Sequence, residues 1–237
     1  MIQISKYEHW DFHRHPHLLC GGDSGSGKSR FLYGLIDRLL DVTSEENIYV
    51  ADAKFEELEE VARDILRLPN VSASTDDIMD IVSHVLTEMR RRHSEKLRNE
   101  APLFLIVDEY MALRLKLKKE PFIELEDNLK EIILLGRSVN VHIVIAMQRV
   151  DSKSIDLSIR DNMAIRIGFG NLSAENFKML FKESRNEHEI ENKNFGEGYV
   201  KIGGEEVRSF TAPRVWLSAD EKPPAKKKWS PLQRKKA

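Results

Sequence analysis

Residues 22–29 read Gly-Asp-Ser-Gly-Ser-Gly-Lys-Ser and come just after the apolar run 18–20. This G-x-x-x-x-G-K-S spacing, between a predicted strand and a predicted helix, indicates a phosphate-binding loop. The glycines permit backbone conformations that point successive N–H groups toward one anion, and the start of the helix adds its own N–H groups. We therefore predict that a nucleotide is bound by nine consecutive residues: Gly22, Asp23, Ser24, Gly25, Ser26, Gly27, Lys28, Ser29 and Arg30.

Two side chains of this loop have chemical roles of their own. Lys28 is long enough to reach the terminal phosphates, and the Ser29 hydroxyl can coordinate Mg²⁺. A plain turn rich in glycine and serine would explain the glycines, but not Gly-Lys-Ser followed by an apolar helix over residues 31–40. Asp23 is unusual in such a loop, because a carboxylate beside phosphates opposes binding unless it points outward or caps the backbone.

An acidic pair follows the continuous apolar strand predicted at residues 103–107. Asp108 suits an outer contact to Mg²⁺ and its waters, and Glu109 can act as the general base that polarises the attacking water. Gln148 ends the next apolar strand, where an amide can sense the terminal phosphate or orient that water. The alternative interpretation of the acidic pair is an ordinary acidic strand end. With a phosphate-binding loop upstream, we favour hydrolysis.

Apolar strands alternate with helical patterns along the chain, which predicts an α/β fold with a mostly parallel central sheet and helices on both faces. Val141–Met147 has the continuous apolar pattern of a strand buried on both faces. Two runs joined by Gly203-Gly204 predict a C-terminal β-hairpin over residues 199–210. The expected strands are 17–20, 47–51, 103–107, 141–147 and 163–169, and the expected helices are 28–40, 55–67, 75–92, 121–138 and 173–180.

Composition limits the class of protein. The chain has 237 residues, 41% of them hydrophobic and 32% charged, with a formal net charge of −2. A near-neutral chain offers no global case for nucleic-acid binding, so any such contact must come from local patches. The single cysteine, Cys20, excludes a disulfide framework and fits a reducing, cytoplasmic compartment. No apolar run approaches the ~20 residues of a membrane span.

We divide the chain into three parts. Residues 1–16 are expected to form a polar lead-in segment, residues 17–217 the nucleotide-binding domain, and residues 218–237 a disordered basic tail. Four histidines near the start of the chain alternate with other residues and leave a metal site as a minor alternative: His9, His13, His15 and His17. No accompanying carboxylate or thiol pattern supports that metal site.

Several blocks of sequence, taken in order, resemble the FtsK/SpoIIIE family of DNA-pumping ATPases. The resemblance covers about residues 11–212, and a methionine, Met147, stands where that family has threonine. The short members of the family on conjugative plasmids and transposons are the most similar. The blocks are Pro16-His-Leu-Leu19, Asp52-x-Lys54, Thr87-Glu-Met-Arg-Arg-Arg92, Leu105-Ile-Val-Asp-Glu-Tyr110, Gly136-Arg-Ser-Val-Asn-Val-His-Ile-Val-Ile-Ala-Met-Gln-Arg149, Ile159-Arg-Asp-Asn-Met-Ala-Ile-Arg166 and Gly196-Glu-Gly198-Tyr199.

The resemblance implies a RecA-like P-loop ATPase domain that uses ATP and Mg²⁺ and assembles as a ring, usually a hexamer, around double-stranded DNA. It implies conjugative DNA transfer, with a relaxase and membrane channel proteins as partners that recruit the chain to the inner face of the membrane. In such a ring an arginine acts in trans on the neighbouring ATP. The matching position is Arg137, with Arg166 as second choice, while Arg149 and Arg160 remain candidates by composition alone.

A DNA translocase grips the phosphate backbone without reading sequence. Four cations after the acidic pair are expected to form a basic loop that faces the DNA: Arg114, Lys116, Lys118 and Lys119. They alternate with leucines, so an amphipathic surface segment without a role in DNA binding explains them equally well. Two other functions stay open for the chain, a nucleotide-dependent switch or adaptor that binds protein partners, and a structural fragment that needs a partner chain to complete the ring.

Overall fold

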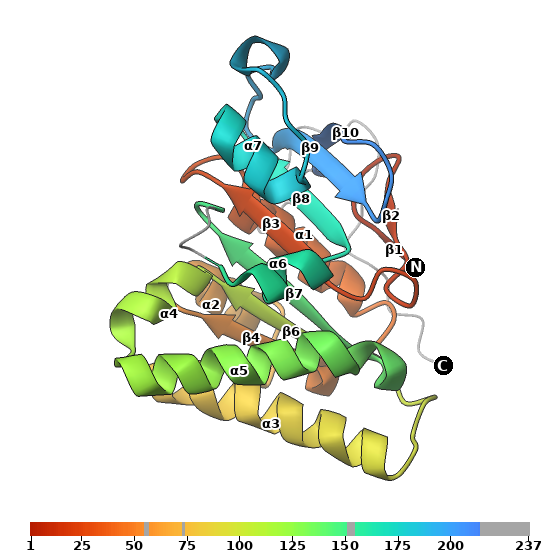
Figure 1. The fold of residues 1–237 in the computed structure, drawn as a ribbon. Coiled ribbons are helices and arrows are strands. Elements are labelled where there is room, and N and C mark those ends of the chain that lie inside the picture. Colours follow the sequence, from red (N-terminus) through yellow and green to blue (C-terminus); the bar gives the residue numbers. More distant parts are fainter. Residues whose placement is uncertain (55–56, 73, 151–154, 214–237) are drawn as a thin grey trace.

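A computed structural model describes residues 1–54, 57–72, 74–150 and 155–213. An eight-stranded sheet runs through the molecule in the order β10-β9-β8-β3-β7-β6-β4-β5, and helices cover both of its faces (Figure 1). The α/β fold with a mostly parallel sheet is confirmed. The basic tail predicted over 218–237 and the last residues of the predicted domain, 214–217, lie outside the described residues.

Six neighbouring strands of the sheet are parallel. Five of them match the predicted apolar strands, and the sixth, the two-residue β5, has no apolar run that could have predicted it. The predicted C-terminal hairpin is also present and pairs antiparallel with β8. The strands are β3 (Leu18–Gly22), β4 (Ile48–Asp52), β5 (Asn70–Val71), β6 (Leu103–Asp108), β7 (Val141–Met147), β8 (Ile165–Phe169), β9 (Glu197–Ile202) and β10 (Arg208–Thr211).

Successive residues of each central strand feed two different hydrophobic cores, because side chains alternate across a sheet. In β6, Leu105 and Val107 belong to the core beneath α3 and α5, whereas Phe104 and Ile106 belong to the core beneath α1. Figure 1 shows α3 and α5 side by side along one face. The helices are α1 (Lys28–Leu39), α2 (Glu57–Glu60), α3 (Thr75–Ser94), α4 (Tyr110–Lys116), α5 (Lys119–Leu135), α6 (Leu157–Asn162) and α7 (Ala174–Phe181).

Short helical turns complete the secondary structure. The π-helical stretch η2 (Val61–Ile65) continues α2, and η3 (Gly136–Val139) continues α5 into β7. The remaining 3-10 turns are η1 (Glu45–Asn47) and η4 (Glu187–Glu189). The predicted helix over 75–92 begins where its sequence indicates, since the Ser74 side chain accepts a hydrogen bond from the Asp77 N–H at 3.1 Å. Within the described ranges, no helix combines the length and apolar character needed to traverse a bilayer.

The prediction of a polar lead-in over residues 1–16 is wrong. This segment forms a two-stranded antiparallel sheet of β1 (Ile2–Gln3) and β2 (His9–Trp10), and the fully buried Trp10 packs edge-on against Phe104 of β6. The Trp10 indole N–H also donates to the His15 carbonyl. A strand of two residues is too short to show a periodic pattern. The sequence therefore gives no sign that the aromatic side chains of this segment belong to the hydrophobic core.

Candidate nucleotide-binding and catalytic site

Four neighbouring strands bring the phosphate-binding loop, the acidic pair and Gln148 to one edge of the sheet. Strands β3, β7, β6 and β4 are adjacent and parallel, so their carboxyl ends meet. The phosphate-binding loop follows β3, Gln148 follows β7, and the acidic pair ends β6. Asp52, at the end of β4, lies directly opposite Asp108 in the pairing register. The carboxyl edge of a parallel sheet is where α/β proteins place their ligands.

The phosphate-binding loop has the backbone shape that its glycines predict. Gly25 and Gly27 both have positive φ angles, 76° and 99°, and Gly27 is the N-cap of α1. The Ser26 N–H donates to the Asp23 carbonyl at 3.2 Å, which closes the turn. Asp23 is exposed. A solvent-exposed carboxylate is screened by water, which weakens its opposition to phosphate binding.

Lys28 joins the loop to the acidic pair. Its Nζ lies 2.6 Å from Glu109 Oε1 and 3.1 Å from Asp108 Oδ1, and all three side chains are buried. Burial alone would lower the pKa of Lys28, but the neighbouring carboxylates outweigh it and hold this pKa above its usual value. Lys28 is therefore a fixed positive charge at the point where the loop and β6 meet.

Asp108 and Glu109 differ in their surroundings. Burial, together with the charges of Asp52 and Glu109, raises the pKa of Asp108, while Lys28 opposes that rise. Glu109 has a left-handed backbone conformation, with φ 52° and ψ 49°, and is the N-cap of α4. A non-glycine residue held in this region costs about 1 kcal/mol or more and persists where the surrounding structure imposes it. Such strain is typical of functional sites.

Lys54 also belongs to this cluster, although it is not among the site residues predicted from the sequence. Its Nζ lies 3.6 Å from Glu109 Oε1, so Glu109 is held between two ammonium groups. Asp52 fixes the loop that carries Lys54, since its carboxylate accepts the N–H groups of Lys54 and Glu59 at 2.9 and 3.3 Å. The signal was available, because Asp52-x-Lys54 directly follows a strand that ends at the same sheet edge.

The residues present fit a bound nucleotide. A Cβ on Gly27 would stand 2.6 Å from the Gly196 nitrogen, so the tight loop requires glycine there. The buried Ser26 Oγ makes no hydrogen bond within the described structure. The loop N–H groups and Lys28 can hold phosphates, and Asp108 with Ser29 are hard oxygen ligands suited to Mg²⁺. These assignments remain predictions from the motif and its geometry.

A family model described as an AAA domain matches residues 12–152. The chain belongs to this family. The AAA domain therefore covers more than half of the chain and contains the phosphate-binding loop, the acidic pair and Gln148, and it places the chain among the P-loop ATPases.

Curated relatives of this AAA domain carry the FtsK name, as the resemblance predicts. The Ftsk domain-containing protein YdcQ of Bacillus subtilis (strain 168) is 25% identical, over 91% of this chain and 46% of the relative. The DNA translocase FtsK of Treponema pallidum (strain Nichols) is 29% identical, over 67% and 22% respectively. The ESX secretion system protein EccC of Thermomonospora curvata is 30% identical, over 88% and 17%. The chain thus spans less than half the length of these relatives.

Solved structures share the fold. The pCW3 conjugation coupling protein TcpA, solved in monomer form with ATPgS, superposes with a TM-score of 0.73 at 20% identity, covering 89% of this chain and 63% of that one. The cytoplasmic domain of the Thermomonospora curvata type VII secretion ATPase EccC superposes with a TM-score of 0.66 at 26% identity, covering 84% and 25%.

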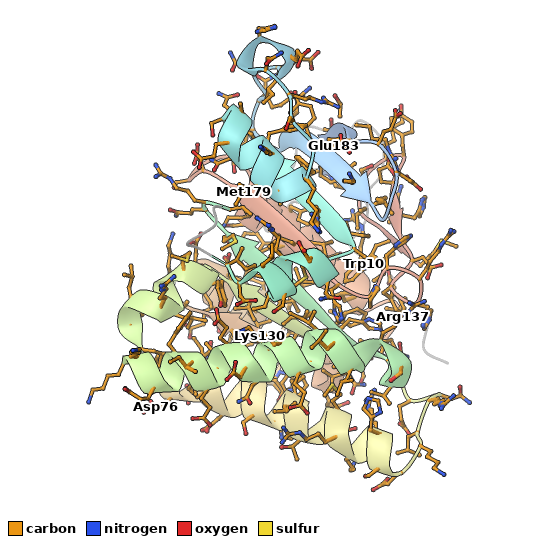
Figure 2. All side chains as sticks on the ribbon, viewed as in Figure 1. Trp10, Asp76, Lys130, Arg137, Met179 and Glu183 are labelled. Carbon is orange, nitrogen blue, oxygen red and sulfur yellow. The ribbon has the colours of Figure 1, made fainter. Side chains whose placement is uncertain are left out.

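Arg137 lies at the opposite edge of the AAA domain from its own phosphate-binding loop. It belongs to η3, just before β7 begins, and its Nε donates to the His13 carbonyl at 3.1 Å. Figure 2 shows it at the end of α5 remote from α4. It is exposed. Arg137 therefore cannot serve the site of its own chain, and a role in trans stays a prediction.

Arg166, the second candidate for the arginine that acts in trans, is held by hydrogen bonds within its own chain. It is buried on β8, and its guanidinium donates to the carbonyls of Met163, Leu180 and Arg160 at 3.0, 3.1 and 2.9 Å. Burial lowers its pKa. Three backbone acceptors inside its own chain hold this side chain away from any neighbouring subunit, so Arg137 is the better candidate.

The basic segment after β6 is helical rather than a loop. Arg114 and Lys116 lie on α4, Lys118 is the N-cap of α5, and Lys119 begins α5. All four are exposed at the edge that carries the site. The Arg114 guanidinium lies 6.0 Å from the centre of the Phe122 ring. A contact between these cations and DNA remains a prediction.

Among the residues that the structure describes, the N-terminal histidines do not form a group that could hold a metal ion. His17 is buried, its Nδ1 accepts the Ile143 N–H at 3.1 Å, and its Nε2 therefore carries the proton and donates to the Ile133 carbonyl at 2.9 Å. Burial lowers the pKa of His17 to about 4. Both ring nitrogens are occupied by the backbone, so this histidine ties β3 to α5 and β7.

Proposed function

We propose that this chain is the ATP-hydrolysing motor domain of a double-stranded DNA translocase that serves conjugative transfer of a mobile element. The observation that carries the proposal is the buried contact of Lys28 with Asp108 and Glu109, which couples a phosphate-binding loop to a candidate general base. The relatives named DNA translocase FtsK and the fold shared with a conjugation coupling protein support the choice of substrate.

The residues suggest how hydrolysis is prepared. Mg²⁺, when bound with ATP, would neutralise charge on the β- and γ-phosphates, with Ser29 and Asp108 as its protein-side partners. Lys28 is the ammonium that Glu109 would share with the phosphates, so loosening its contact to Glu109 frees that carboxylate to accept a proton from water. In this proposal Lys54 keeps Glu109 oriented, and the half-buried Gln148, which follows the strand next to β3, orients the water.

A ring is the assembly that this division of labour requires. Arg137 and the phosphate-binding loop lie on opposite edges of the sheet, so one subunit can offer its arginine to the site of the next only in a head-to-tail contact. We propose that this contact closes into a hexamer around DNA, with Arg114, Lys116, Lys118 and Lys119 toward the duplex. A relaxase and membrane channel proteins are the proposed partners, and they would recruit the chain to the inner face of the membrane.

A second candidate function is a nucleotide-dependent switch that engages protein partners and moves no DNA. The observation in its favour is the set of relatives named for secretion systems, including EccC.

ATP turnover measured with linear duplex DNA added and omitted, with mass photometry of the same samples, separates the two functions. Translocation predicts DNA-stimulated turnover that depends on salt, together with ring-sized assemblies in the presence of ATP and DNA. Turnover that DNA leaves unchanged while a partner protein raises it would favour the switch. A protein that neither binds nor hydrolyses ATP would overturn both.

A further inference from the structure

A turn near the C-terminal hairpin is fastened onto the phosphate-binding loop. The Gly196 N–H donates to the Ser26 carbonyl at 2.8 Å, and the Gly196 carbonyl accepts the Ala212 N–H at 2.8 Å. On its other side, the Gly170 N–H donates to the Glu197 carbonyl at 2.9 Å. The turn therefore stands at a fixed position beside the N-cap of α1, where the phosphates of a nucleotide would bind.

The turn is also closed on itself. The Glu197 carboxylate accepts both the backbone N–H and the side-chain amide of Asn194, at 3.1 and 3.0 Å. The Glu197 N–H donates back to the Asn194 carbonyl at 3.0 Å. Gly196 has a positive φ of 76°, which lets the chain reverse within this span. The residue at the tip, Phe195, is thus held by the backbone on both sides.

Phe195 presents its ring to solvent next to the loop. Its side chain is 65% exposed. Its Cε2 lies 3.6 Å from the position that a Cβ on Gly27 would occupy, so the edge of the ring lies beside the last glycine of the phosphate-binding loop. An exposed aromatic ring on a rigid turn leaves apolar area in water that a flat ligand could cover.

We propose that Phe195 is the platform on which the base of the bound nucleotide stacks. The inference rests on the proposed function, because it needs the phosphates to be held by the loop that Phe195 lies beside. The ligand that combines a polyphosphate with a flat apolar ring is a nucleoside triphosphate, and the base is the part that the loop itself leaves unbound. Base–aromatic stacking tolerates any base, since every base has a π-face.

The test compares two ligands on the full chain: Mg²⁺-ATPγS, which has a base, and inorganic tripolyphosphate, which has none. Binding is measured by calorimetry for the wild type, Phe195→Ala, Phe195→Trp and Lys28→Ala. Tyr7→Ala is the matched control, because Tyr7 is an aromatic residue with 77% exposure in the turn between β1 and β2. Circular dichroism melting checks that each variant is folded.

Stacking predicts that Phe195→Ala weakens ATPγS binding by about 5- to 30-fold and leaves tripolyphosphate binding unchanged. Phe195→Trp restores ATPγS binding, and Tyr7→Ala affects neither ligand. Wild-type affinity for ATPγS in Phe195→Ala would overturn the proposal, as would an equal loss for both ligands, which would mean that the ring only shapes the loop. Lys28→Ala should weaken both ligands, and if it weakens neither, the failure is that of the proposed function.

Discussion

Glu109 combines a strained backbone with a buried charge that two lysines neutralise. Glu109 has its left-handed backbone conformation at the junction of β6 and α4, and its carboxylate pairs with Lys28 there. A strained and buried acidic residue at the end of an apolar strand lowers the free energy of unfolding, because burying a carboxylate is costly even when it is paired. We take this cost as the signature of a residue retained for chemistry.

Glu109→Gln tests that role. The amide keeps the shape of the side chain and removes its ability to take a proton, so we expect ATP binding to persist while turnover falls by about 10²–10⁴-fold. Lys28→Ala is the contrasting variant, in which binding itself weakens. Stopped-flow binding and a phosphate-release assay measure the two effects. Normal turnover in Glu109→Gln would remove Glu109 as the base.

The element that most constrains the site is the junction of β3 and α1. Gly27 must have a φ of 99° and must leave room for the Gly196 nitrogen, so it joins the phosphate-binding loop to the turn that carries Phe195. No periodic pattern links these two segments, which are far apart in the sequence. Their contact exists because β3 and β8 are neighbours and β9 pairs with β8.

Gly27→Ala should lower the free energy of unfolding by about 1–3 kcal/mol, because the new Cβ meets backbone and the φ angle disfavours a side chain. Gly204→Ala is the matched control, since a Cβ there meets no atom within 4 Å. Urea denaturation of both variants measures the difference. Equal stabilities for the two variants would show that the loop can shift without cost.

The segment of α4 and the start of α5 carries the predicted DNA contact. Reversing the charges of Arg114, Lys116, Lys118 and Lys119 should reduce the DNA-stimulated part of the ATPase rate, and its salt slope should fall by about 0.9 for each lost phosphate contact. The control reverses two exposed cations between α3 and β6, at the other edge of the sheet: Lys96 and Arg98. An unchanged salt slope in the α4 variant would exclude this surface.

Within one chain, the two groups proposed to act on ATP, the phosphate-binding loop with Lys28 and the arginine Arg137, lie at opposite edges of the sheet. Mixing experiments use that separation. Lys28→Ala and Arg137→Ala proteins should each be inactive alone, whereas an equal mixture should recover about a quarter of the wild-type turnover, because one interface in four then pairs an intact loop with an intact arginine. A mixture as inactive as its components would contradict a role for Arg137 in trans.

The stability of the whole fold should depend on pH through His17. Its folded pKa is about 4, below the ordinary value of 6.5, so the unfolded chain takes up a proton first as the pH falls. The contribution is complete above pH 6.5, and the free energy of unfolding then drops by on the order of 1.4 kcal/mol per pH unit toward pH 4. Urea denaturation between pH 7.5 and 5 measures this slope. Burial also lowers the pKa of His142, to about 3, so this second histidine adds a similar slope. His17→Gln should therefore reduce the slope by about half, and an equally steep slope would assign it to groups other than His17.

The sequence predicts the loop, the acidic pair, most strands of the parallel sheet and its terminal hairpin, because each depends on local spacing or on a continuous apolar run. It missed the buried N-terminal residues around Trp10, the helix α4 and the place of Lys54 beside Glu109. These features depend on the packed fold, as do the position of Phe195 beside Gly27 and the distance of Arg137 from the phosphate-binding loop of its own chain. Strand order sets them, and strand order arises from packing between segments distant along the chain, which no local pattern records.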